Sequence, residues 1–130
     1  MKNKQRRIEL PTGVLTIEVE DSDLNLDQLC DFAARRNPKR GFLFVSKVLG
    51  KHIPISPKIM RDCYKRLARK IPRDLPGPIV FIGMAETATA LGHGVYEEYV
   101  KRTSRQDAVF IHTTRYELDK EKALNFAEEH

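Results

Sequence analysis

The sequence has no tryptophan, only two cysteines in 130 residues, and no long apolar run. A membrane-spanning helix needs roughly 20 mostly apolar residues, so we expect no membrane segment. The basic N-terminal residues lead into no apolar signal-peptide core, which favours a cytoplasmic location. Cys30 and Cys63 lack CxxC or Cys/His spacing. We therefore expect two thiols on the apolar sides of helices, and neither a disulfide nor a cysteine metal site.

The length and composition are those of one globular domain. Apolar residues make up 41% of the chain and charged residues 32%, a balance typical of soluble proteins. A chain of 130 residues can bury one modest core but not two. We therefore expect a single domain over residues 1–130.

Positive charge is concentrated in the front of the chain. Residues 1–75 contain 17 basic and nine acidic side chains, a net charge of +8, whereas residues 76–130 contain six and nine, a net charge of −3. A basic surface suits a polyanionic partner, either a phosphorylated metabolite or a nucleic acid. The alternative is an ordinary solvated helix surface.

The front of the chain predicts a β-hairpin followed by a helix. Residues 7–10 and 14–19 alternate apolar and polar side chains around a turn that contains Gly13. Asn25 can cap a helix, and apolar residues with helical spacing follow it, so we expect a helix over residues 26–36.

The rest of the chain alternates predicted strands and helices. The most secure helix begins with the cap Ser56 followed by Pro57 at its first position. We predict strands over residues 42–46, 79–84 and 108–111, and helices over residues 57–71, 91–100 and 120–129. Such alternation indicates an α/β fold, with a mostly parallel sheet flanked by helices and an N-terminal β-hairpin.

Residues 83–92 carry the clearest indication of a ligand site. Small and hydroxylated residues follow a predicted strand and open a helix, so backbone N–H groups and the positive helix end would favour a phosphate. The segment matches neither the P-loop nor the dinucleotide fingerprint. The alternative is a tight turn whose small residues serve packing. The candidate residues are Ala85, Glu86, Thr87, Ala88, Thr89 and Ala90.

Two other predicted strands end in polar residues at the same sheet edge. Ser46, Lys47, Lys51 and His52 follow the strand at residues 42–46, and the run 112–116 follows the last strand. Ligands bind at the carboxyl edge of open α/β sheets. Arg115 could hold a phosphate with two hydrogen bonds or form a local salt bridge, and His52 could be only a surface imidazole.

Residues 37–57, 79–100 and 112–116 together resemble the orotate-phosphoribosyltransferase-like family of tellurite-resistance gene clusters, and the resemblance extends over residues 37–130. It implies the type I phosphoribosyltransferase fold, phosphoribosyl pyrophosphate as substrate, Mg²⁺ with its diphosphate, and transfer of ribose 5-phosphate to an unidentified acceptor. It also implies that residues 85–90 hold the pyrophosphate, that Ser46, Lys47, Lys51 and His52 lie beside the substrate pocket, and that Arg115 leads into a mobile loop.

One departure from the family pattern shapes the expected function. The strand that ends in two acidic residues and a Thr/Gly loop, which would hold the ribose hydroxyls and the 5-phosphate, has no counterpart here. We therefore expect a partial domain that needs a C-terminal partner segment, and an apolar edge that favours a homo-oligomer. His52, His112 and Glu86 all stay open as the general base. The alternative function is a non-catalytic module that binds RNA or a phosphorylated metabolite.

Overall fold

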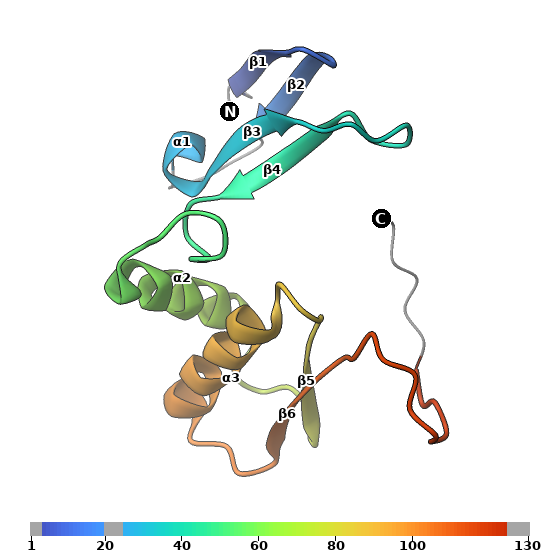
Figure 1. The fold of residues 1–130 in the computed structure, drawn as a ribbon. Helices are drawn as coiled ribbons and strands as arrows, with labels where there is room; N and C mark the ends of the chain where they lie inside the picture. The colour runs from blue at the N-terminus through green and yellow to red at the C-terminus, as the bar shows by residue number, and fades with distance from the viewer. Residues whose placement is uncertain (1–3, 20–24, 125–130) are drawn as a thin grey trace.

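The computed structural model describes residues 4–19 and 25–124 of the chain. Figure 1 shows two β-ribbons at one end and a helix-and-strand unit at the other. In chain order the elements are β1 (Lys4–Leu10), β2 (Gly13–Val19), α1 (Leu26–Leu29), β3 (Cys30–Ala34), β4 (Phe42–Ser46), α2 (Pro57–Lys70), β5 (Ile79–Gly83), α3 (Thr89–Thr103) and β6 (Ala108–His112).

The strands of the described residues form three separate two-stranded sheets. β1 pairs with β2 and β3 with β4, both antiparallel, and only β5 and β6 pair in parallel. The α/β class and the N-terminal hairpin are confirmed, but the prediction of one mostly parallel sheet is wrong for these residues. The reason is that β4 bonds to β3, its neighbour in the chain, and does not join β5.

The predicted helix over residues 26–36 is mostly a strand. Asn25 does cap α1, since its side chain accepts a hydrogen bond of 3.1 Å from the Asp27 amide. The helix ends after one turn, and β3 then pairs with β4 along its whole length. The rings of Phe32 and Phe44 meet edge to face at 5.0 Å across this pair. Strand pairing therefore outweighs the local helical spacing, which is a weak preference.

The cysteines only partly match the expectation. Both are free and half-buried, but Cys30 lies on strand β3 while Cys63 lies on helix α2. Partial burial raises the pKa of both thiols, as expected where the thiolate is poorly solvated.

Helices α2 and α3 pack together through small residues and one tyrosine. The start of α2 is as predicted: the Ser56 side chain accepts a hydrogen bond from the Lys58 amide and Pro57 occupies the first turn. A side chain at Gly94 of α3 would come within 2.2 Å of the Tyr64 ring, so the two helices can approach this closely only with glycine there. At the end of α2, Arg102 donates to the carbonyls of Ala68 and Ile71, at 2.9 and 2.6 Å.

Helix α3 also covers one face of the β5–β6 sheet. Tyr99 is fully buried and its ring lies 5.2 Å from that of Phe81 on β5. The opposite face of this sheet carries Val80 and Ile82 on β5, and Val109 and Ile111 on β6, all exposed. The sheet is thus apolar on both faces, a pattern typical of strands that are covered on both sides.

The segment after β6 has no helix where the structure describes it. Residues 113–124 form bends and irregular chain, so the predicted helix over residues 120–129 does not begin at residue 120, and its last five residues, 125–129, lie outside the described part. None of the helices seen in residues 4–19 and 25–124 has the length and apolar character to cross a membrane.

Candidate functional site

The loop between β5 and α3 is held by close backbone packing. β5 ends at Gly83 and α3 begins at Thr89. A side chain at Gly92 would lie 3.0 Å from the Gly83 Cα and 3.2 Å from the Phe110 ring. Glycine at position 92 therefore lets the first turn of α3 lie directly against the end of the strand, which fixes where the helix begins.

Hydrogen bonds from the end of β6 fix the first residues of the loop. The Thr113 amide donates to the Gly83 carbonyl at 3.0 Å, and the Ala85 amide donates to the Thr113 hydroxyl at 2.8 Å. The Ala88 amide donates to the Met84 carbonyl at 3.0 Å. The Ala85–Glu86 peptide bond is cis. Thr113 thus joins the two strand ends, a role that the sequence analysis did not single out among the polar residues after β6.

Several N–H groups around the loop remain open to a ligand. The residue before helix α3, Ala88, is its N-cap and makes no side-chain capping hydrogen bond. Among the described residues, no acceptor is in hydrogen-bond contact with four backbone N–H groups of this segment, those of Glu86, Thr87, Ala90 and Leu91. Unpaired donors at the start of a helix, where the helix dipole is positive, form a favourable environment for an anion.

Lys51 brings a positive charge to this loop from another part of the chain. Its ammonium group contacts the Thr87 hydroxyl, although 36 positions separate the two residues. Both side chains are exposed, and so is Glu86 beside them. The structure therefore brings together two predicted site residues, one after β4 and one after β5, at the open end of α3.

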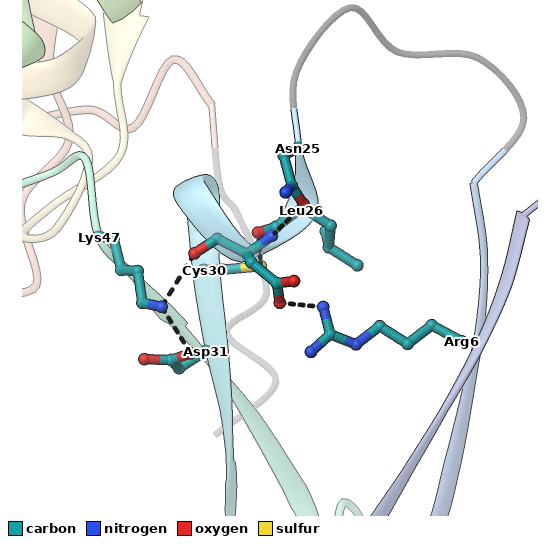
Figure 2. Close-up of polar contacts among 7 residues, drawn as sticks. Arg6, Asn25, Leu26, Cys30, Asp31 and Lys47 are labelled. Carbon is teal, nitrogen blue, oxygen red and sulfur yellow. Dashed lines mark hydrogen bonds and ion pairs between the residues drawn. The ribbon is translucent and has the colours of Figure 1, made fainter.

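Two of the other predicted site residues after β4, Lys47 and Ser46, make their contacts outside the Thr87 loop. Figure 2 shows Lys47 directed to α1 and β3, where its ammonium lies 2.7 Å from the Asp31 carboxylate and 2.9 Å from the Asp27 carbonyl. The Ser46 hydroxyl accepts a hydrogen bond of 3.2 Å from the Val48 amide. His52 is exposed in the following turn. Of the four candidates after β4, Lys51 is the one seen in contact with the Thr87 loop.

The residues after β6 line a groove beside the same strand ends. The groove has a volume of about 590 Å³ and contains Arg115 and His112 together with the apolar side chains of Ile82, Met84 and Ile111. The His112 Nδ1 atom lies 3.0 Å from the Thr113 carbonyl. Met84 of the loop lines the groove, and so does Thr113, which is hydrogen-bonded to Ala85 of the loop. A ligand could therefore extend from one to the other.

The described residues offer little for a metal ion. No group of three or more His, Cys, Asp or Glu side chains gathers within the parts of the chain that the structure places. Mg²⁺ commonly binds through one or two carboxylates together with substrate phosphates. Glu86 is the only carboxylate in the loop itself, so these residues do not form a metal site by themselves.

A parallel strand pair whose connecting loop opens an uncapped helix is the phosphate-binding arrangement of many α/β proteins. A model of the family described as Phosphoribosyl transferase matches residues 29–130. The chain belongs to this family. No curated protein and no solved structure matches the chain.

Proposed function

We propose that the chain binds the diphosphate of phosphoribosyl pyrophosphate, or pyrophosphate itself, at the loop of residues 85–90. The observation that carries this proposal is the meeting of Lys51 with Thr87 beside the unpaired N–H groups of that loop. A cation, a hydroxyl and several unpaired amides on one loop suit the oxygens of a diphosphate.

In the transfer reaction these groups would act on the leaving group. Breaking the bond between the ribose carbon and the diphosphate leaves negative charge on the diphosphate oxygens, which the Lys51 ammonium and the N–H groups would stabilise. Arg115, in the adjoining groove, would add a second cation from the side of β6. Lys47 is left out of this role because it contacts Asp31.

For this chain by itself we propose binding of the diphosphate ligand, not transfer of the ribose 5-phosphate. Transfer of ribose 5-phosphate to an acceptor also requires groups for the ribose hydroxyls and the 5-phosphate, which we expect from a C-terminal partner segment. Mg²⁺ would enter with the diphosphate. The acceptor stays unidentified, and His52, His112 and Glu86 all stay candidates for the general base. The link to tellurite-resistance clusters is an expectation from the resemblance.

The test is calorimetric titration of pyrophosphate and of phosphoribosyl pyrophosphate, each with and without Mg²⁺. Thr87→Val and Lys51→Met should each weaken binding by about tenfold, equivalent to ~1.4 kcal/mol, because each removes one direct contact. Thr16→Val, at an exposed position of β2, and Lys47→Met are the matched controls and should bind as the unaltered chain does. If neither ligand binds the folded chain, or if the controls weaken binding equally, the loop is not the site.

The alternative is a non-catalytic module that binds a phosphorylated metabolite or RNA through the same fold. Its support is the excess of basic residues in the front of the chain. Salt separates it from the first proposal, because binding through many phosphates weakens steeply as salt rises. A ligand held by loop amides should respond less.

A further inference from the structure

Helix α2 carries a basic surface that the diphosphate site does not use. Its sequence has six basic residues and a single acid, Asp62. Lys58, Arg61 and Arg69 are exposed and Lys65 is half-exposed. In the described residues, none of these four cations has a carboxylate partner within ion-pair distance. We name these four residues the α2 basic face.

The position of this face follows from how α2 packs. Tyr64 and Ala68 lie on the side toward α3, since Gly94 of α3 meets the Tyr64 ring and Arg102 reaches the Ala68 carbonyl. Lys65 and Arg69 each follow one of these by one position, so they lie about 100° further round the helix. Lys65 and Arg69 therefore lie to one side of the contact with α3. Arg61, seven residues before Ala68, lies near the same side as Ala68 but is exposed, so the α2 basic face is open to solvent.

The spacing of the four cations suits a chain of phosphates. They follow one another at intervals of three, four and four residues, which places successive side chains about 5 to 6 Å apart along a row of about 16 Å. Phosphates along a nucleic-acid backbone are close enough for such a row to contact several of them. The face has no exposed aromatic side chain on which a base could stack, so the contacts would go to phosphates and carry little sequence preference.

We infer that the α2 basic face binds the phosphate backbone of a nucleic acid. An anionic membrane is the less suitable partner, because helices that lie on membranes combine basic residues with exposed Trp, Phe or Leu. On α2 only Ile59 and Leu67 are exposed large apolar residues, at 45% and 42%. The nucleic-acid site would be separate from the loop that holds Thr87.

The experiment measures fluorescence anisotropy of a labelled 20-nucleotide oligouridine with the full chain over a salt series, with oligothymidine of the same length as a second arm. The variant Arg61→Gln/Lys65→Gln/Arg69→Gln should weaken binding at least about tenfold and reduce the slope of log K against log salt by about 2, since each lost phosphate contact removes about 0.7 for a single strand. Asp62→Asn should strengthen binding.

The matched control removes the same charge elsewhere on the molecule, at exposed cations outside α2: Lys39→Gln/Arg40→Gln/Lys101→Gln. It should change the affinity by no more than about twofold, and all variants should keep the pyrophosphate affinity of the unaltered chain. Similar binding of both oligonucleotides, or tighter binding of RNA, supports the inference. Equal weakening by both triple variants, or binding to anionic vesicles with none to either oligonucleotide, would overturn it.

Discussion

The front and rear parts of the molecule are held together by different forces. In the front part, residues 4–19 and 25–46, the two ribbons and α1 meet through exposed polar contacts such as Arg6 with Asp27 and the Thr12 hydroxyl with the Gly41 carbonyl, and no described residue is fully buried. In the rear part, residues 57–112, Tyr99, Ala68 and Ala108 are buried between helices and strands. Apolar burial contributes far more to stability than exposed ion pairs do. The rear part should therefore dominate the free energy of unfolding.

This difference also bears on the proposed site. The loop that carries Thr87 is fixed by the packed rear part, through Gly92 against β5 and Thr113 from β6. Lys51 reaches it from the connection between the two parts. A binding loop that must present its N–H groups in a defined arrangement gains from a rigid support.

Loss of Tyr99 should have the largest effect on stability. Tyr99→Ala removes a fully buried ring and the 3.1 Å hydrogen bond from its hydroxyl to the Pro72 carbonyl. We expect a loss of about 3 to 5 kcal/mol in the free energy of unfolding, measured by chemical denaturation. Tyr99→Phe, which keeps the ring, should lose about 1 kcal/mol.

The control for this prediction is Tyr116, whose side chain is 81% exposed. Tyr116→Ala should stay within about 0.5 kcal/mol of the unaltered chain. If Tyr99→Ala proved no more damaging than Tyr116→Ala, the packed rear part would not be the source of stability.

An acid titration should reveal how much the ion pair between Arg105 and Asp107 contributes to the stability of the rear part. Arg105 donates to both carboxylate oxygens of Asp107, at 2.7 and 2.6 Å, and to the Leu75 carbonyl. These bonds lower the pKa of Asp107 and raise that of Arg105. A carboxyl whose pKa is lower in the folded state stabilises it above the unfolded pKa, and this contribution disappears as the pH falls.

The free energy of unfolding should therefore drop between about pH 5 and about pH 3, and by less in Asp107→Asn than in the unaltered chain. Denaturation at several pH values measures this difference. Asp74→Asn, which removes an exposed carboxyl on the connection before β5, is the matched control. An equal pH dependence in Asp107→Asn and the unaltered chain would contradict the assignment.

The elements that local sequence predicts well are those that local interactions determine. The hairpin at Gly13, the helix that starts at Ser56 and the strands after residues 41, 78 and 107 lie where their turn, cap and apolar signals indicate. Residues 30–34 could not be predicted in this way, because what makes them a strand is their pairing with β4, which begins at Phe42, eight positions after Ala34. Only the pairing itself shows that they form a strand.

The candidate site likewise combines features that the local sequence predicts with features that depend on tertiary contacts. The small and hydroxylated residues 85–90 indicate a loop at the end of a strand, and the structure has a loop between β5 and α3. Which distant cation reaches that loop depends on tertiary geometry: Lys47 and Lys51 are equally plausible in the sequence, yet one contacts Asp31 and the other Thr87. The role of Thr113 depends on the parallel pairing of β5 with β6, which local signals do not give.

The smallest expected effect comes from the front part. Lys47→Met removes the contacts with Asp31 and with the Asp27 carbonyl, which join β4 to β3 and α1 (Figure 2). Because the Asp31 side chain is 57% exposed, solvent and salt screen the pair, and the loss should be at most about 0.5 to 1 kcal/mol. High salt should reduce the difference between Lys47→Met and the unaltered chain, as it does for exposed pairs. A loss as large as that of Tyr99→Ala would mean that the two parts unfold as one unit that depends on this contact, and the contrast between them would fail.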